Sequence, residues 1–488
     1  MESVKKSTAL QFHKLSLQQK HILGLVSDNL RKPKLKRGQI KLVIAGNAGA
    51  GKSTLILRIK ELLDEQQKRE TDFSYIVASF TGINANQIEG FTLHHCFGLP
   101  LSAPKTRDDR HKFIQKWVRT PKRAQLNAVQ FIIIDELSFI GDDYFVLIDS
   151  LLRAANPQSQ RIPFGGKSII ICGDIFQLLP IKQRSLFQPS EDSQAYQLYT
   201  SISQSFVLEQ VFRQGGQSCE QIKYRQFLDR LRHKKSTVED TLWIRTRREI
   251  VLPQSEKDQF KDALRIFPYR IEVANYNKKA LCERFAGKLV TISNNGIYLQ
   301  IAVGCKVIFT KNVRYLVEEG VTNSSVGTVT RINLRVAENR NGRYGLVDIN
   351  SVEVSVKVKG EPKSVLVVPG MCPLNTIPLA LAYSVTIHRC QGIQLDKAVV
   401  HLGKDEFTTN SDYIVFSRVR SLNDIMIGDI FIDHDRLTRK LNETKYVEAE
   451  DKRLKRLQHA CYREKNIISY LSKRSLGFFQ RNGIRHKT

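Results

Sequence analysis

The segment 46–53 has the residue types and spacing that hold phosphate groups. It reads Gly-Asn-Ala-Gly-Ala-Gly-Lys-Ser and fits the pattern G-x-x-x-x-G-K-[ST]. Glycines in such a loop let backbone N–H groups curl around phosphate oxygens, and the dipole of the following helix favours the same negative charge. The pattern predicts a nucleoside triphosphate site in which Lys52 reaches the β- and γ-phosphates and Ser53 binds Mg²⁺. The residues expected to contact the nucleotide here are Gly46, Asn47, Ala48, Gly49, Ala50, Gly51, Lys52, Ser53 and Thr54.

Two acidic residues supply the second half of a hydrolytic site. Asp135 and Glu136 directly follow the apolar run 131–134, which is typical of a buried strand. A parallel sheet places such residues at its carboxyl edge, where phosphates bind. We expect Asp135 to join the Mg²⁺ shell and Glu136 to polarise the attacking water. With the loop at 46–53, this pair predicts a chain that hydrolyses nucleoside triphosphate or descends from one that did.

Two arginines stand in suggestive contexts. Arg213 lies in Leu-Glu-Gln-Val-Phe-Arg-Gln, and Arg418 ends Tyr-Ile-Val-Phe-Ser-Arg. Each could stabilise the charge on the γ-phosphate in the transition state, as arginine fingers do. The alternative for each is a surface salt bridge, which is the ordinary fate of an arginine in a chain with 76 Lys and Arg residues.

The elements that must position these residues alternate between β and α patterns, as in a parallel α/β sheet. Short apolar or β-branched runs predict buried strands at 40–45, 74–79, 131–134 and 168–172. Helical periodicity follows the first run, with an apolar stripe formed by Leu55, Ile56, Ile59, Leu62 and Leu63.

The pattern changes after about residue 287. Strands are expected at 289–292, 306–309 and 327–332, and four valines alternate along 352–358 as in a half-buried antiparallel strand. Glycines mark turns between them. A small β-rich module therefore interrupts the α/β pattern, which resumes near Pro378.

The charge balance points to a polyanionic partner. The 488 residues suggest about three domains, and 41% hydrophobic with 25% charged residues exclude disorder throughout. The 76 Lys and Arg residues against 48 acids give a net charge of +28. Nucleic acid is the leading candidate for such a chain, and a scattered solubilising charge is the alternative.

The two ends are the most basic parts. Residues 1–40 hold nine Lys or Arg and two acids, and residues 445–488 hold twelve and four. The run 31–37 suits a nuclear localisation cluster, a phosphate-contacting arm or a solvated linker equally well. The segment 445–488, helical in pattern around 451–471, is either an arm that contacts DNA phosphates or a solvated tail.

Cysteine usage and hydropathy bear on location. The eight cysteines stand singly, without the spacing of a zinc site or a disulfide framework, and so fit a reducing compartment. No apolar run approaches 18 residues, and the N-terminus has no secretory pattern. We expect an intracellular protein without a membrane partner, in the nucleus rather than the cytoplasm or mitochondrion.

A series of motifs covering roughly residues 15–430 resembles PIF-type DNA helicases, the petite integration frequency family related to RecD within helicase superfamily one. Besides the loop at 46–53 and the acid pair, the family's order is kept by segments at 15–19, 81–85, 90–94, 173–181, 212–214, 303–308 with Asn312, 323–329, 384–392 and 416–418. Any one of these segments is a weak signal, but the series in register is a strong one.

The resemblance implies an α/β fold with two RecA-like P-loop NTPase motor domains and a small β-barrel inserted in the second. The implied parts are a basic N-terminal segment 1–36, a first motor domain 37–207 with a duplex-splitting wedge near 86–110, a second motor domain 208–321 and 378–440, the barrel 322–377, and a basic C-terminal segment 441–488. Arg213 and Arg418 would then face the ATP from the side opposite Lys52, Asp135 and Glu136.

The resemblance also assigns roles to residues. Gln19 would read adenine, Gln177 would sense the γ-phosphate and pass its state to DNA, and Gly392 would lie on the nucleotide side. The residues implied to contact nucleic acid are Thr81, Gly82, Thr92, His94, Asn323, Thr386, His388 and Gln391. Gln394, Cys390 and Asn84 depart from the family's usual residues, and none of these departures removes an ATP-site residue.

The implied function is an ATP-dependent DNA helicase that uses ATP and Mg²⁺, moves 5′→3′ on single-stranded DNA and unwinds tailed or forked duplexes as a monomer. Repair, recombination and replication of DNA are the processes that such a motor serves. Two alternatives remain open: an ATP-gated nucleic-acid-binding or annealing protein without unwinding, and the motor part of a replicative transposase.

Overall fold

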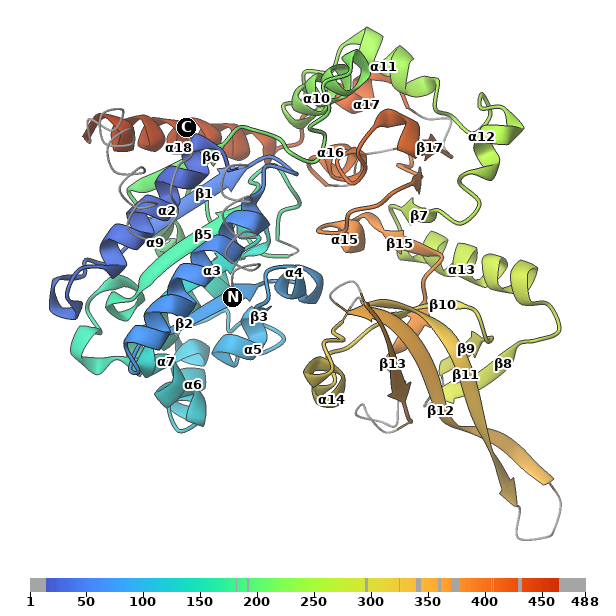
Figure 1. Ribbon diagram of the computed structural model, residues 1–488, viewed down its shortest axis with the longest axis horizontal. Helices are drawn as coiled ribbons and strands as arrows, with labels where there is room; N and C mark the ends of the chain where they lie inside the picture. The colour runs from blue at the N-terminus through green and yellow to red at the C-terminus, as the bar shows by residue number, and fades with distance from the viewer. Residues whose placement is uncertain are drawn as a thin grey trace, which may run out of the picture. The chain divides into compact units, whose positions relative to one another are not determined.

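The computed structural model describes residues 15–180, 182–190, 193–294, 297–323, 325–338, 344–358, 361–369, 377–404, 406, 408–428 and 432–464. The chain forms two compact units (Figure 1). The first unit combines the chain up to Phe80 with Gln87–Gly215 and the segment from Leu441 onward. The second unit comprises Thr81–Asn86 and Gly216–Lys440. The boundary between the two units lies after Gly215, whereas the resemblance implied a domain boundary after 207.

The first unit is built on a six-stranded parallel sheet in the order β3-β2-β4-β5-β1-β6. The four strands predicted at 40–45, 74–79, 131–134 and 168–172 are confirmed within two residues. The strands are β1 Lys41–Gly46, β2 Ser74–Ser79, β3 Phe91–Thr92, β4 Val129–Asp135, β5 Ser168–Gly173 and β6 Gln204–Leu208.

Helices cover this sheet and bury its apolar runs. Alternate residues of β1, Leu42 and Ile44, pack with the apolar stripes of α2 and α3 in one core cluster. The predicted stripe after the phosphate loop is confirmed, since its members are buried or packed against that cluster. The helices of this unit are α2 Leu17–Leu30, α3 Lys52–Arg69, α5 Leu93–Phe97, α6 Arg107–Trp117, α7 Pro121–Ala128, α8 Asp142–Ala155, α9 Gln194–Thr200 and α18 Thr444–Glu464.

Helix α18 corrects the expectation of a separate basic C-terminal segment. Among the described residues it runs over Thr444–Glu464, so the helix predicted around 451–471 begins earlier than expected; it belongs to the first unit and packs beside β6. Its Gln458 side chain accepts a hydrogen bond from the backbone N–H of Val207, and its Glu450 accepts one of 2.7 Å from the hydroxyl of Tyr199. A solvated tail therefore does not describe 444–464, and contact of this segment with DNA phosphates stays a prediction; residues 465–488 lie outside the described part of the chain.

The second unit contains a four-stranded parallel sheet in the order β15-β7-β16-β17, as a second motor domain requires. Its strands are β7 Leu264–Phe267, β15 Ser384–Thr386, β16 Ala398–Val400 and β17 Ile425–Ile427. Its helices are α10 Cys219–Arg232, α11 Val238–Arg245, α12 Gln254–Asp258, α13 Arg270–Phe285, α14 Arg314–Glu318, α15 Ile387–Cys390, α16 Ser411–Phe416 and α17 His434–Thr438. All but the last residue of α4 Gly82–Gln87 also belong to this unit.

The β-rich module is an antiparallel sheet in the order β13-β12-β11-β10-β14. Val352, Val354 and Val356 of β12 are buried, which confirms the alternating strand. The closed barrel at 322–377 is not confirmed: the described strands follow one another in open order, and β10 and β14 lie outside the predicted insertion. The strands are β10 Lys306–Phe309, β11 Val326–Glu338, β12 Tyr344–Val358, β13 Glu361–Val367 and β14 Leu379–Leu381, and β8 Val290–Asn294 and β9 Ile297–Ile301 form a separate hairpin.

In the part of the chain that the structure describes, no helix has the length and apolar character needed to cross a bilayer.

The packing of α18 leads to a stability prediction. Leu454 is fully buried, so Leu454→Ala should lower the free energy of unfolding by about 2–5 kcal/mol because it leaves a cavity beside β6. Leu35→Ala is the matched control, since Leu35 is fully exposed and its loss should change stability by about 0.5 kcal/mol or less. Urea unfolding of the three proteins measures both effects. Equal midpoints for the parent and Leu454→Ala would contradict the packing of α18.

Candidate nucleotide and nucleic-acid sites

The phosphate loop lies between the end of β1 at Gly46 and the start of α3 at Lys52. Gly49 and Gly51 have φ values of 83° and 78°, in the left-handed region that a side chain rarely adopts. The Nζ of Lys52 donates hydrogen bonds of 2.9 Å and 3.0 Å to the carbonyl oxygens of Gly46 and Asn47. The Lys52 ammonium therefore lies against the phosphate loop, next to the N-terminus of α3, where anions bind.

Gln19 supports this loop from one side. It is buried, and its Nε2 donates to the carbonyl oxygens of Gly51 at 3.1 Å and Ala50 at 3.4 Å. Its Oε1 accepts a hydrogen bond from the backbone N–H of Ser16, in a capping box that begins α2. Both ends of the amide are engaged within the protein here, and the contact of Gln19 with adenine stays a prediction.

Arg213 is close to the other side of the loop, which corrects its expected position. It belongs to the first unit, together with Lys52, rather than to the second motor domain. The backbone N–H groups of Phe212 and Arg213 donate to the carbonyl oxygen of Gly49 at 2.8 Å and 3.4 Å. A Cβ added at Gly49 would lie 2.6 Å from that of Arg213, so only glycine permits this approach. Phe212 and Arg213 therefore help to shape the phosphate loop.

The acid pair lies where β4 ends. Asp135 is the last residue of the strand, and Glu136 follows in a left-handed conformation with φ of 67°. Burial raises the pKa of the Asp135 carboxyl above its ordinary value, and the charge of Lys52 and the backbone N–H of Glu136 oppose that rise. The influence of Lys52 on the Asp135 pKa reflects the proximity of the two groups, as their predicted roles require.

Ser79 is a site residue that the sequence motifs did not single out. It is fully buried at the end of β2, opposite Asp135 in the strand register. Its Oγ donates a hydrogen bond of 3.0 Å to Oε2 of Glu136 and so fixes the carboxylate. The signal available in the sequence was its position: a hydroxyl residue ends the strand that neighbours the acid pair.

Gln177 lies on the loop after β5, at the same carboxyl edge of the sheet. Its Nε2 lies 3.5 Å from Oδ2 of the buried Asp174, and its backbone N–H donates to the carbonyl oxygen of Asp174 at 3.0 Å. The first unit thus brings Lys52, Asp135, Glu136 and Gln177 to one edge, and Asp174 is a further support that was given no role beforehand.

Arg418 belongs to the second unit, just after α16. Its side chain is buried, with Nε donating to the carbonyl oxygen of Ile414 at 2.8 Å and Nη2 to Oγ of Ser417 at 2.8 Å. Arg418 is 2% exposed and forms no ion pair with a carboxylate among the described residues. The alternative of a surface salt bridge is therefore wrong for this arginine.

Residues implied to contact DNA gather in two places in the second unit. Thr386 caps the start of α15 by accepting a hydrogen bond of 3.4 Å from the N–H of Arg389, and His388 is half-buried on that helix. Burial and the charge of Arg270 lower the pKa of His388, so the ring is neutral near pH 7. Gln391 is 3% exposed, and neither atom of its amide group has a hydrogen-bond partner among the described residues.

The other place in the second unit joins the segment Thr81–Asn86 to residues near Asn323. The Nδ2 of Asn86 donates to Oγ1 of Thr322 at 2.9 Å. A Cβ at Gly82 would lie 3.0 Å from the carbonyl oxygen of Asn323, whose N–H donates to Oδ1 of Asn312 at 2.7 Å. Thr81, Gly82 and Asn323 thus belong to one local assembly.

Thr92 and His94 lie in the first unit, where the structure gives them packing roles. Thr92 caps α5 by accepting a hydrogen bond from His95, and the His94 ring packs edge-on against Phe80 and Tyr144. Burial lowers the pKa of His94.

An exposed aromatic residue next to Thr92 was not singled out in the sequence. Phe91 is 53% exposed, and its ring stacks on that of His95 at 5.0 Å between centroids. Flat, exposed rings of this kind are suited to base stacking.

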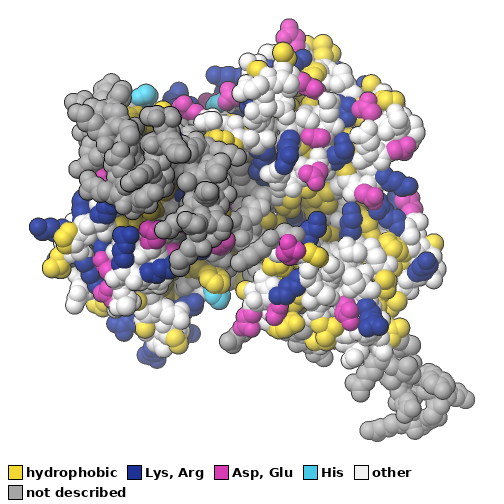
Figure 2. Space-filling model, in the orientation of Figure 1, with side chains coloured by type: hydrophobic (Ala, Val, Ile, Leu, Met, Phe, Trp, Pro, Cys, Tyr) yellow, Lys and Arg dark blue, Asp and Glu magenta, His cyan; other side chains and the backbone are white. Residues whose placement is uncertain are grey.

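The basic charge has no single location on the face shown in Figure 2. Lys and Arg side chains there are spread among acidic ones rather than gathered in one continuous patch. On this face, the described residues therefore give no basic stripe that by itself traces a path for a polyanion.

Comparisons with known proteins agree with the motif series. The family model described as PIF1-like helicase matches residues 14–237. The ATP-dependent DNA helicase PIF1 of Emericella nidulans is 25% identical over 83% of this chain and 59% of its own length. The protein of the same name from Rattus norvegicus is 28% identical over 85% of this chain and 61% of its own length. The chain thus spans about three fifths of the length of these curated relatives.

Solved structures share the fold over nearly the whole chain. The Pif1 helicase from Candida albicans has a TM-score of 0.67 and 22% identity, covering 90% of this chain and 98% of that one. A Bacteroides Pif1 helicase, in complex with ADP-AlF3 and ssDNA, has a TM-score of 0.61 and 22% identity, covering 90% and 97%. With the two parallel sheets, these matches confirm the predicted α/β fold with two RecA-like domains. Motifs and comparisons agree, and the chain is similar to the PIF1-like helicases.

Proposed function

We propose that this protein is an ATP-dependent DNA helicase that moves 5′→3′ along single-stranded DNA and unwinds duplex DNA. The observation that carries the proposal is the set of hydrolytic side chains at one edge of the first sheet: Asp135 ends the buried strand β4, Glu136 follows it, and Lys52 follows the loop after β1. The motif series and the PIF1-like relatives extend this ATPase site to a DNA motor.

Hydrolysis follows from the chemistry of these side chains. Lys52 leaves the carbonyl oxygens of its loop to bind the β- and γ-phosphates. Ser53 and Asp135 present hydroxyl and carboxylate oxygens, which suit Mg²⁺, and the ion they hold would neutralise charge on the phosphates. Glu136, fixed by Ser79, orients the attacking water. Gln177 senses the γ-phosphate from the next strand end, and Arg418 of the second unit supplies positive charge in the transition state.

The proposed partner is single-stranded DNA, alone or as the tail of a forked duplex. A Bacteroides relative has been solved with ssDNA, and another structure concerns unwinding at forked dsDNA. Here Thr386, His388 and Gln391 would contact the strand, together with the assembly around Gly82 and Asn323. Phe91 would stack on a base without regard to its identity. We propose a monomeric motor that acts in the nucleus, in repair, recombination or replication.

Strand displacement tests the proposal directly. With ATP, the protein should displace the strand from a duplex with a 5′ single-stranded tail and leave blunt and 3′-tailed duplexes of the same sequence largely intact. Lys52→Ala is the control and should displace nothing, since it removes the ammonium that lies at the phosphate loop. ATP hydrolysis without displacement on any tailed duplex would favour an ATP-gated binding or annealing protein instead.

Glu136→Gln should bind ATP with near-parental affinity and lose turnover. The substitution removes the carboxylate that orients water and leaves Asp135 and Ser53 in place. Nucleotide binding and steady-state hydrolysis, measured separately, check this. Glu61→Gln, on the exposed face of α3, is the matched control and should behave as the parent. Hydrolysis by Glu136→Gln within a few-fold of the parental rate would refute the role of Glu136.

Arg418→Ala should lower kcat for ATP by about 10³, as the loss of an arginine finger does, with a smaller effect on ATP affinity. The exposed Arg420, two residues further along the chain, provides the control, and Arg420→Ala should keep the parental kcat. Measurements of kcat and nucleotide Kd decide the matter. A folded Arg418→Ala protein with parental turnover would show that Arg418 does not act as an arginine finger.

A further inference from the structure

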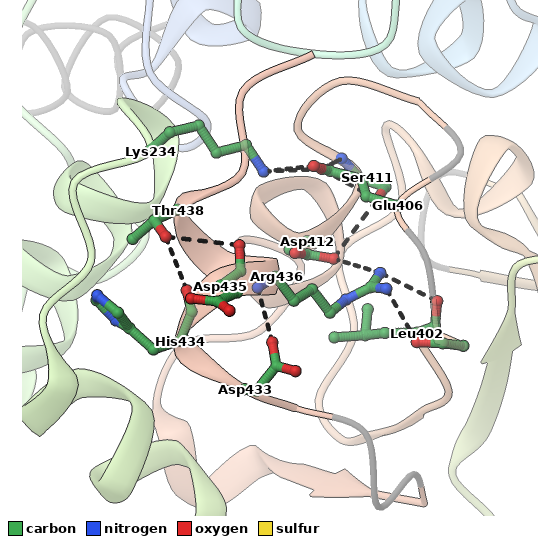
Figure 3. A network of polar contacts seen from close by, with 11 residues as sticks. Lys234, Leu402, Glu406, Ser411, Asp412, Asp433, His434, Asp435, Arg436 and Thr438 are labelled. Atoms are coloured by element: carbon green, nitrogen blue, oxygen red, sulfur yellow. Dashed lines mark hydrogen bonds and ion pairs between the residues drawn. The ribbon is translucent and has the colours of Figure 1, made fainter.

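Four charged side chains that were given no role above form a buried cluster in the second unit (Figure 3). The charge cluster consists of Lys234, Glu406, Asp412 and Arg436. Their side chains are 1%, 0%, 0% and 2% exposed. Two positive and two negative groups therefore balance one another in the interior.

The contacts inside the charge cluster are short and directional. The Nζ of Lys234 lies 2.8 Å from both carboxylate oxygens of Glu406. The guanidinium of Arg436 donates to Oδ1 of Asp412 at 2.9 Å and to the carbonyl oxygens of Leu402 and Gly403 at 3.0 Å and 2.9 Å. Ser411 joins the two pairs, because its Oγ lies 3.3 Å from Oε1 of Glu406 and 3.5 Å from Oδ1 of Asp412.

A buried cluster of charges is not an efficient way to stabilise a fold. Removing charges from water costs several kcal/mol per ion, and apolar side chains of similar volume often stabilise a protein as well or better. Lys234 also has a left-handed backbone, with φ of 55°, which is uncommon for a residue with a side chain. Hydrogen bonds between charged groups are directional, so they fix the orientation of the groups that they join. Apolar packing does not do this.

The groups held by the charge cluster begin helix α16. Ser411 and Asp412 are its first two residues, and the Asn410 side chain makes no capping hydrogen bond. Glu406 takes the place of a cap, since its Oε1 accepts a hydrogen bond of 3.1 Å from the N–H of Ser411. A helix of six residues has little stability of its own, so its position depends on these external contacts.

The other end of α16 carries Arg418. The Nε of Arg418 is bonded to the carbonyl oxygen of Ile414 in α16, and the hydroxyl of Tyr224 donates to the carbonyl oxygen of Phe416 at 2.6 Å. A shift or tilt of α16 would therefore move the guanidinium with it. Displacing a catalytic group by about 1 Å lowers rates by up to about 10²-fold.

We propose that the charge cluster positions Arg418 for ATP hydrolysis by clamping the start of α16, an inference that rests on the proposed function of Arg418. Glu406 is the central positioning residue, because it bonds both Lys234 and the first N–H of the helix. Neither Lys234 nor Arg436 nor either carboxylate touches the nucleotide in this scheme.

The charge cluster also predicts a pH dependence. Three charged groups face Glu406: Lys234 from the loop after α10, Asp412 from α16 and Arg436 from α17. Burial and the charge of Asp412 raise the pKa of Glu406 to about 7, against the lowering effect of Lys234 and Arg436. Protonation removes the negative charge that holds Lys234, so kcat should fall as the pH drops through about 7.

Glu406→Gln in the full chain tests the proposal. It should lower kcat for DNA-stimulated ATP hydrolysis about tenfold or more, keep the KM for ATP within about twofold, and abolish the acid limb of the pH profile. Asp240→Asn is the matched control: Asp240 is a buried carboxylate in the same unit, paired with Arg230 at 2.6 Å, and it makes no hydrogen bond to α16 among the described residues. Its kcat should stay within about twofold of the parent.

A second variant distinguishes an effect on the position of Arg418 from an effect on the stability of the protein. Lys234→Met combined with Glu406→Gln removes the unpaired ammonium, so thermal stability should recover toward the parent while kcat stays low. Recovery of kcat together with stability would overturn the proposal, as would equal kcat values for Glu406→Gln and Asp240→Asn. Adding Glu406→Gln to Arg418→Ala should cause no further loss of kcat, because the cluster acts through Arg418.

The outcome for Arg418→Ala distinguishes the two proposals. Parental turnover in that variant overturns both the arginine's role and the role of the charge cluster. A large loss with Arg418→Ala but parental turnover with Glu406→Gln overturns only the cluster's role and leaves the proposed helicase function standing.

Discussion

The central strands of the first unit are held in parallel register by backbone hydrogen bonds, and they end side by side. Ala45 of β1 lies opposite Gly173 of β5, and Ile134 of β4 lies opposite Ile171. The phosphate loop, the acid pair and the loop of Gln177 therefore all begin at one edge of a buried sheet. A slip of one strand by one residue would turn its side chains to the opposite face and separate these groups.

Supports around these groups come from short hydrogen bonds rather than from the motifs themselves. Gln19 and the backbone of Phe212 hold the phosphate loop from two sides, and Ser79 holds Glu136. In the second unit, Glu406 does the same for the helix that leads to Arg418. Gln19, Ser79 and Glu406 are buried, where a hydrogen bond is stronger and a missing partner is more harmful than at the surface.

The strands that position the nucleotide site could be predicted from local sequence patterns. The features that depend on contacts between distant residues could not. Apolar runs predicted the four strands nearest the nucleotide, because burial on both faces leaves a continuous signal. The side of the site on which Arg213 lies depends on a backbone contact with Gly49, and no local pattern records it. The charge cluster joins residues as far apart as Lys234 and Arg436, whose charges look like surface charges in the sequence.

Helix α18 also bears on how the chain folds as it is made. Strand β6 is at the edge of its sheet, and α18 covers it with the bond from Val207 to Gln458. The segment Gly216–Lys440 of the second unit separates β6 from α18 along the chain, so during synthesis this edge stays open while more than two hundred residues emerge from the ribosome. An open edge can pair with strands of neighbouring nascent chains. Chaperone binding at β6 during translation would protect the protein over that interval.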